Sequence, residues 1–258
     1  MALILIKGKM SSPNLNVDDG GSGSLPVVFV HSLAGNTSHW SAQLEHLRKE
    51  RRAVALDIRG HGNSESPKDG NFAIESLASD IDAVADELGL QRFVLVGHSS
   101  GGTVAIAYAD LHQEKVASLL LADPSGDVRK VPAEQVNLLM GTLESDSYSK
   151  AIEDYYGMLL TGSQLAVREK VIEDLRNTPC ETVIGIFKSS LRHDPLTPLQ
   201  LYKGPKLSVV TSLNDAPFSL HNLDTDLPHI RVTGYGALAA DGQTRRVQSD
   251  FGRIPDLC

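Results

Sequence analysis

An apolar run that leads directly into a glycine-flanked serine constrains this chain more than any other stretch. Residues 93–96 read Phe-Val-Leu-Val, residues 97–101 read Gly-His-Ser-Ser-Gly, and a helical pattern follows over 103–111. A serine held in a strained turn between a strand and a helix needs glycine neighbours, because side chains there would collide with nearby backbone. The pattern predicts a sharp turn that exposes the Ser99 hydroxyl. The N-terminus of the helix would then face any negative charge that forms beside it.

Short apolar runs recur along the chain and define its layout. Each has four to six residues without polar alternation, which suits strands buried on both faces of a parallel sheet. Amphipathic stretches lie between them, and apolar residues from Ile74 to Leu88 recur at the three- and four-residue spacings of a helix face. Strands that alternate with helices predict an α/β fold with a doubly wound sheet. The five runs are Val27–Val30, Ala53–Leu56, Phe93–Val96, Val116–Leu121 and Leu207–Val210.

The alternation breaks over 126–205, where helical patterns follow one another. A helical insertion at this point, after the run Val116–Leu121 taken as the sixth strand, would cover the carboxyl edge of the sheet, where ligands bind in such folds. We therefore expect a sheet core made of 1–125 and 206–258, and a helical cap over 126–205 that acts as a lid. A solvated appendage is the alternative. The predicted cap helices begin at Pro132 and cover 148–160, 164–175 and 182–191.

Composition narrows the class of partner. The 258 residues carry a formal net charge of -8, which argues against nucleic acid or an anionic membrane as a partner, because both prefer a basic surface. No stretch approaches the roughly 18 apolar residues of a membrane span, and the run Ala2–Ile6 is too short for the core of a signal peptide. Cys180 and Cys258 are typical of free thiols in a reducing compartment. We expect a cytoplasmic protein without a metal or organic cofactor.

Two loops upstream of Ser99 follow predicted strands and fit the same site. The loop over 31–35 would supply a backbone N–H from Leu33 to a developing oxyanion, and Ser100, the residue after the serine, would supply the second. The next strand runs into a glycine-rich loop, where we expect Asp57 and Arg59 to pair and hold the loop in place.

With these segments the chain resembles the α/β-hydrolase superfamily, close to its capped serine esterase, lactonase, perhydrolase and C–C-bond hydrolase members. The resemblance runs from about Asn14 to Gly236. It implies a mostly parallel eight-stranded sheet flanked by helices, with a helical cap inserted after strand 6. It also implies an acyl-enzyme route in which Ser99 is the nucleophile.

The family places its catalytic acid after the strand that follows the cap. Asp215 occupies that position, five residues beyond the run Leu207–Val210. Asp123, at the end of the preceding strand, is the alternative acid position. We favour a turn role for Asp123, because it stands directly before Pro124.

The family base is a histidine in the pattern Gly-x-Gly-His after the last strand. Here the chain reads Gly234-Tyr-Gly236-Ala237, so alanine stands at the expected base position, and it cannot accept a proton. The tail after Gly236 also departs from the family, since it lacks the amphipathic helix and the charged-Pro-acidic segment expected there. Both departures fall at the same point in the chain.

A shift of reading frame would explain both departures. Residues 237–258 can be encoded by codons that, with the first nucleotide removed, read His-Trp-Leu-Gln-Met-Asp-Lys-Pro-Asp-Glu-Phe-Asn-Arg-Ile-Leu-Asp-Glu-Phe-Leu-Thr-Phe. This alternative tail restores the motif histidine, the proline and a helical pattern together. Sequencing the gene tests the hypothesis, which requires such a frame after the Gly236 codon.

Other histidines could replace the missing base. His221 and His229 flank the last two predicted strands and are the candidates, although each is also an ordinary strand-end residue. His31, His61 and His98 lie beside the predicted site, and we expect them to be scaffold.

The sequence thus leads to two functions. The first is hydrolysis of small carboxylic esters or lactones, with Ser99 as nucleophile, Leu33 and Ser100 as oxyanion donors, and Asp215 orienting a base. The second is a ligand-binding protein of the same fold that has lost turnover, which Ala237 favours.

Overall fold

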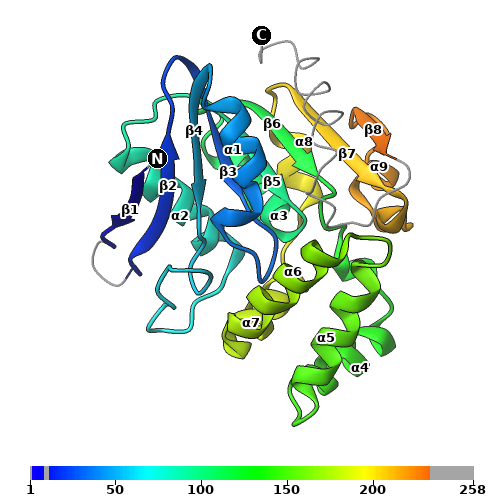
Figure 1. Ribbon diagram of the computed structural model, residues 1–258. Helices are drawn as coiled ribbons and strands as arrows, with labels where there is room; N and C mark the ends of the chain where they lie inside the picture. The colour runs from blue at the N-terminus through cyan, green and yellow to red at the C-terminus, as the bar shows by residue number, and fades with distance from the viewer. Residues whose placement is uncertain (1, 9–11, 233–258) are drawn as a thin grey trace.

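The computed structural model describes residues 2–8 and 12–232 and places eight strands in one sheet (Figure 1). The strand order is β1-β2-β4-β3-β5-β6-β7-β8. Among the described strands, β2 runs antiparallel to its neighbours β1 and β4, and every other neighbouring pair is parallel. The predicted α/β-hydrolase fold with a mostly parallel eight-stranded sheet is confirmed. The strands are β1 Ala2–Ile6, β2 Leu15–Gly20, β3 Ser24–Val30, β4 Arg51–Leu56, β5 Phe93–His98, β6 Val116–Ala122, β7 Lys206–Thr211 and β8 His229–Val232.

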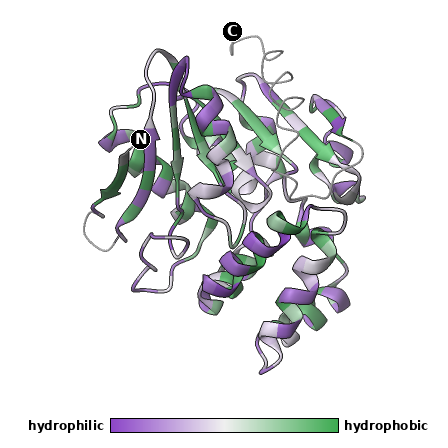
Figure 2. Ribbon diagram, in the orientation of Figure 1, coloured by the Kyte–Doolittle hydropathy of each residue, from purple (hydrophilic) through white to green (hydrophobic). Residues whose placement is uncertain are grey.

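Helices cover both faces of the sheet, which explains the unbroken apolar runs. Side chains alternate between faces along a strand. Val28 and Val30 of β3 accordingly pack in one buried cluster with α2 and α3, whereas Val27 and Phe29 pack in a second cluster with Trp40 and α1. Figure 2 shows the central strands as predominantly hydrophobic. The α-helices outside the segment 133–190 are α1 Ser41–Leu47, α2 Ile74–Glu87, α3 Ser100–Leu111, α8 Leu196–Leu201 and α9 Leu220–Leu223. Short 3-10 turns are formed by Thr37–Trp40, Val128–Lys130 and Ser212–Asn214.

Four of the five α-helices that the structure describes between β6 and β7, namely α4 to α7, form the segment that Figure 1 shows gathered beside the sheet. We call them the inserted helices. Each predicted helix of this segment is present, and prolines 132 and 179 directly precede two of them, consistent with the preference of proline for helix starts. No helix within the described ranges is long and apolar enough to cross a membrane. The inserted helices are α4 Ala133–Leu143, α5 Tyr148–Leu159, α6 Leu165–Asn177 and α7 Cys180–Ser190.

The predicted pairing of Asp57 with Arg59 is wrong. The Arg59 guanidinium makes a buried bidentate contact with Asp80 of α2, at 2.6 and 2.9 Å. Asp57 instead accepts hydrogen bonds from the backbone N–H groups of Thr37 and Asn63, at 2.6 and 2.9 Å. Two opposite charges that stand two residues apart in the sequence need not pair, because the conformation of the loop backbone sets the direction of each side chain.

Candidate active site

Ser99 occupies a strained turn between β5 and α3. Its backbone angles are φ 51° and ψ -119°, a region that residues with side chains rarely adopt. A Cβ added at Gly97 would lie 2.5 Å from the Gly101 carbonyl oxygen, and one added at Gly101 would lie 2.3 Å from that of His31. The two glycines therefore allow the neighbouring backbone segments to approach more closely than a residue with a side chain would permit.

Strained backbone conformations cluster at the carboxyl ends of the strands, where Ser99 lies. Among the described residues, the non-glycine residues with positive φ are Ala34 (57°), Ser99 (51°) and Asp123 (48°). They follow the carboxyl ends of β3, β5 and β6, which are adjacent in the sheet. Clustered strain of this kind is common at functional sites, where the surrounding fold compensates for its cost.

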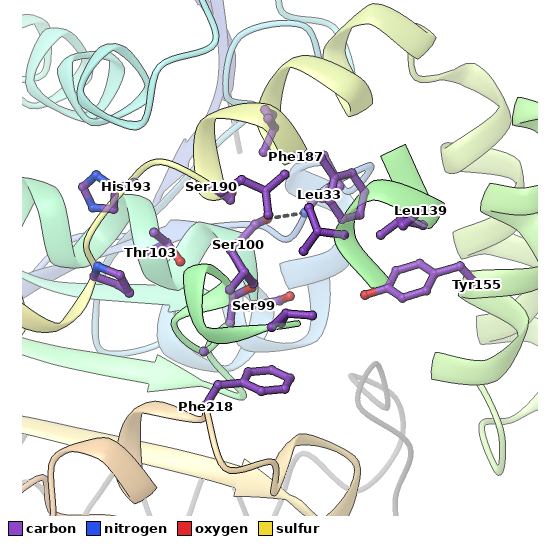
Figure 3. Close-up of a pocket in the computed structure, with 18 of the residues that line it drawn as sticks. Leu33, Ser99, Ser100, Thr103, Leu139, Tyr155, Phe187, Ser190, His193 and Phe218 are labelled. Atoms are coloured by element: carbon purple, nitrogen blue, oxygen red, sulfur yellow. Dashed lines mark hydrogen bonds between the residues drawn. The ribbon is translucent and has the colours of Figure 1, made fainter. Parts of the chain in front are cut away.

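Ser99 lies at a cavity of about 310 Å³ (Figure 3). On one side the cavity is lined by Ser99, Ser100 and Leu33, which lie at the carboxyl ends of the strands. Residues of the inserted helices α4, α5 and α7 form the opposing wall. This volume is at the small end of the range for ligand sites, so it suits a small substrate. The apolar side chains from the inserted helices are Val136, Leu139, Met140, Tyr155, Tyr156, Leu159, Ile186 and Phe187.

The loop after β3 brings the Leu33 backbone to the start of α3. The Leu33 N–H donates a hydrogen bond of 2.6 Å to the side-chain Oγ of Ser100 (Figure 3). The Leu33 carbonyl accepts one of 2.7 Å from the Tyr156 hydroxyl of α5. Burial raises the pKa of Tyr156, so this hydroxyl stays a donor. An inserted helix thus fixes the loop that carries one predicted oxyanion donor.

Asp215 follows β7 and is held in a cluster of donors. It accepts hydrogen bonds from Arg231 of β8, from His221 Nε2 at 3.1 Å and from Asn222 Nδ2 at 3.1 Å. The bonds from Arg231, and then those from Asn222 and His221, hold the pKa of this carboxyl well below its usual range, so Asp215 is ionised. Among the described residues, the cavity wall includes Phe218 but not Asp215. The predicted base position, Ala237, lies outside the described residues.

A family model for the alpha/beta hydrolase fold matches residues 26–203. The chain belongs to the α/β-hydrolase fold family. A thermophilic esterase from Thermogutta terrifontis superposes on it with a TM-score of 0.82 at 25% identity, over 100% of this chain and 99% of the esterase. The enol-lactonase from Burkholderia xenovorans LB400 superposes with a TM-score of 0.78 at 20% identity, over 95% of this chain and 96% of the lactonase.

Curated relatives match this α/β hydrolase over part of their length. The sn-1-specific diacylglycerol lipase ABHD11 of Mus musculus is 28% identical over 185 residues, 70% of this chain. The dihydrolipoyllysine-residue acetyltransferase component of the acetoin cleaving system of Pseudomonas putida is 37% identical over 107 residues, 42% of this chain. The chain spans 59% and 29% of the lengths of these two relatives.

The two histidines considered as replacement bases lie away from the cavity of this α/β hydrolase. His221 is buried and donates from Nε2 to Asp215, and its ring centroid is 5.0 Å from that of His229. His229 begins β8, three strands from β5 in the sheet order, which corresponds to about 14 Å. Neither is among the described residues that line the cavity. The structure therefore does not bring them to Ser99.

Asp123 ties two strands together at this edge of the α/β-hydrolase sheet. Its carboxylate oxygens accept hydrogen bonds from the Thr211 N–H at 2.9 Å and the Thr211 hydroxyl at 2.8 Å. Because both oxygens are engaged by the end of β7, Asp123 acts in this geometry as a turn residue that joins β6 to β7.

His31 and His61 are buried beneath the same loops. Burial lowers the pKa of each ring to about 3, so both are neutral near pH 7. His31 accepts a hydrogen bond from the Ile58 N–H at 3.1 Å, and His61 Nδ1 bonds the Arg59 carbonyl at 3.0 Å. The His31 contact joins the loops after β3 and β4, and the His61 contact lies within the loop after β4, as expected for scaffold.

Sequence reasoning missed His193, one of several polar residues of the cavity wall. His193, in the loop after α7, lines the wall and bonds Glu75 of α2 through Nδ1 at 3.0 Å. No local pattern marks His193, because its partner lies 118 residues away in the sequence. Only the packing of α7 against α2 brings the two together.

Proposed function

We propose that this α/β hydrolase cleaves small carboxylic esters or lactones through an acyl intermediate on Ser99. The observation that carries the proposal is the strained Ser99 turn in the wall of a small, largely apolar cavity, which Leu33 also lines. The likeness to an esterase at 25% identity over the whole chain supports the same reaction class.

In the proposed reaction, the Ser99 Oγ attacks the carbonyl carbon while a base takes the hydroxyl proton. The carbonyl electrons move onto oxygen, and the backbone N–H groups of Leu33 and Ser100 stabilise the resulting oxyanion. Collapse of this intermediate expels the alcohol, which receives the proton, and leaves the acyl group on Ser99. Water then repeats the sequence and releases the carboxylic acid.

The base of this scheme is a histidine that the alternative reading frame supplies at position 237. Asp215, ionised and beyond the end of β7, would orient it. The Asp215 carboxylate would then have to accept a hydrogen bond from the new imidazole in addition to those from Arg231 and His221. With Ala237 in place, the chain keeps the nucleophile and the oxyanion donors but lacks the motif base.

The inserted helices act as the lid of this site. They contribute most of the apolar wall of the cavity. They are also anchored to the sheet part, since His39 of the first 3-10 turn bonds Asp174 of α6 at 2.8 Å and Tyr156 bonds the Leu33 carbonyl. Substrate would therefore enter between two parts that are joined at fixed points.

Hydrolysis of p-nitrophenyl acetate tests the proposal. The chain is compared with one whose residues 237–258 are replaced by the alternative tail, and each is also made with Ser99→Ala. We expect the new tail to raise kcat by at least about 10³-fold, because removing the histidine of a serine triad costs that much or more. Ser99→Ala should abolish the gain. Activity that survives Ser99→Ala would exclude the mechanism.

A second function is favoured by Ala237 alone. A chain that keeps the cavity without the base would bind an ester or lactone and not turn it over. In the same experiment, an alternative tail that leaves kcat unchanged while an ester still binds would favour this ligand-binding function.

A further inference from the structure

Thr103 of α3 carries a hydroxyl without a partner in the wall of the cavity. The residue is 5% exposed and lines the cavity together with Ser99. Its Oγ1 makes no hydrogen bond with any described residue but keeps accessible surface, unlike fully buried unpaired atoms such as Trp40 Nε1. Because Thr103 lines the cavity, this surface faces it. Buried polar groups are nearly always paired, so this hydroxyl points to a partner that arrives with the ligand.

Threonines in helices commonly donate to the carbonyl four residues earlier, and other threonines of this chain do so. The Thr142 hydroxyl of α4 donates to the Leu138 carbonyl at 2.8 Å. The Thr178 hydroxyl, at the end of α6, donates to the Asp174 carbonyl at 2.8 Å. Thr103 makes no such bond, so something in its surroundings prevents it.

The carbonyl four residues before Thr103 is that of Ser99, and it is already engaged. It accepts hydrogen bonds from the Gly102 N–H at 2.9 Å and from the Ser125 N–H at 3.2 Å. A carbonyl oxygen has two lone pairs, so the Ser99 carbonyl has none left for the hydroxyl. The fold of the nucleophile turn therefore leaves the Thr103 hydroxyl proton available to a ligand.

Thr103 lies one helical turn beyond Ser99, on the side of the cavity away from the inserted helices. Figure 3 shows Thr103 on one side of Ser99, and Leu139 and Tyr155 on the opposite side. Side chains four residues apart on a helix are about 5–6 Å from each other. A substrate whose reacting carbonyl lies at Ser99 would therefore bring an atom two to four bonds away to Thr103, while its other arm contacts the apolar wall.

The chemistry of an ester sets the direction of this hydrogen bond. Ester and ether oxygens only accept hydrogen bonds, whereas a threonine hydroxyl can donate one. In the proposed reaction the carbonyl oxygen binds the N–H groups of Leu33 and Ser100. The oxygen that Thr103 meets is therefore a second one, on the arm that extends towards this residue.

We propose that Thr103 is a substrate-binding residue whose hydroxyl donates a hydrogen bond to a second oxygen of the substrate. The site would therefore favour esters that carry an ether or ketone oxygen two to four bonds from the reacting carbonyl, with an apolar chain on the other arm. This inference rests on the proposed function, because it assumes that an ester occupies the cavity at Ser99.

Three esters of equal length test the proposal. Butyl butanoate has no second oxygen outside the ester group. Butyl methoxyacetate has an ether oxygen in place of one methylene of the acyl arm, and 2-methoxyethyl butanoate has it in the alcohol arm. Calorimetric Kd values are measured on the Ser99→Ala chain, where no turnover is needed, with and without Thr103→Val.

The variants separate the hydroxyl from the shape of the side chain. Thr103→Val removes the hydroxyl and keeps the branched shape, and its binding of butyl butanoate reports that the cavity is intact. Thr103→Ser keeps the hydroxyl. Thr142→Val is the matched control, a helical threonine outside the described cavity wall.

We expect Thr103→Val to raise the Kd of at least one ether ester, relative to that of butyl butanoate, by roughly two- to tenfold, the usual contribution of one hydrogen bond. Thr103→Ser and Thr142→Val should leave this ratio unchanged. Unchanged ratios in Thr103→Val, or a loss that Thr103→Ser reproduces, would overturn the role of the hydroxyl while leaving the ester site intact. If none of the three esters binds, the proposed function itself is wrong.

Discussion

The Leu33 N–H donates to the Oγ of Ser100 across 2.6 Å, so a predicted oxyanion donor is already engaged by the side chain of the residue that follows Ser99. An N–H group satisfied in this way must exchange its partner before it can bind a substrate oxygen. In the proposed reaction, the Ser100 hydroxyl would therefore compete with the substrate carbonyl for the same amide. Position 100 would then be a place where the rate can be adjusted without changing Ser99.

We expect Ser100→Ala to raise kcat/KM in the chain with the alternative tail. Losing the hydroxyl frees the Leu33 amide, and one exchanged hydrogen bond is worth about 0.5–1.5 kcal/mol, or roughly two- to tenfold in rate. The measurement is p-nitrophenyl acetate hydrolysis. A fall in kcat/KM instead would mean that the Ser100 hydroxyl donates to the oxyanion itself.

The glycines around Ser99 should not tolerate a methyl group. Gly101→Ala would place its Cβ 2.3 Å from the His31 carbonyl oxygen, and backbone cannot move aside cheaply. We expect a loss of at least about 1–3 kcal/mol in the free energy of unfolding, measured by urea titration. Gly157→Ala, in α5 with nothing within 4 Å of the added atom, is the control and should stabilise the chain by about 0.5–1 kcal/mol. Equal effects at the two positions would contradict the packing described for the turn.

The Tyr156 hydroxyl should matter for the site more than for the fold. Tyr156→Phe removes the 2.7 Å bond to the Leu33 carbonyl, which fixes the loop that carries Leu33 to α5. We expect a loss of about 0.5–1.5 kcal/mol in stability, together with a lower kcat in the chain with the alternative tail. Tyr155→Phe removes the same atom from a neighbouring side chain that lines the cavity, and it serves as control. The interpretation fails if the two variants have the same kcat.

Acid should destabilise the chain through His31 and His61. Their folded pKa values, about 3, lie below the ordinary value of 6.5, so the unfolded state binds protons first as the pH falls. Their contribution is complete above pH 6.5 and is lost as the pH falls towards 3. Each ring should remove about 1.4 kcal/mol of stability per pH unit in that window. Urea unfolding at pH 7 and pH 5 checks this, and a flat profile would show that the rings are not buried neutral.

The local features of the site could be predicted from the sequence because short-range physics fixes them. A strand, two glycines and a helix leave Ser99 little freedom, and the structure shows the predicted turn at that point. The apolar runs likewise predicted β3 to β7, since strands buried on both faces need continuous hydrophobicity. The edge strand β1 was not predicted, although Ala2–Ile6 is itself a continuous apolar run. The structure leaves Leu3 and Leu5 exposed, so a run of this kind need not be buried on both faces.

The sequence by itself determined the α/β plan, the strained turn at Ser99 and the missing histidine at position 237, because each depends on residue type and spacing along a continuous stretch. Tertiary structure decided the partners of the polar groups. It paired Arg59 with Asp80, Tyr156 with the Leu33 carbonyl, and His193 with Glu75. Those contacts join segments far apart in the chain, and a hydrogen bond depends on distance and direction, which only the packing of helices against the sheet establishes.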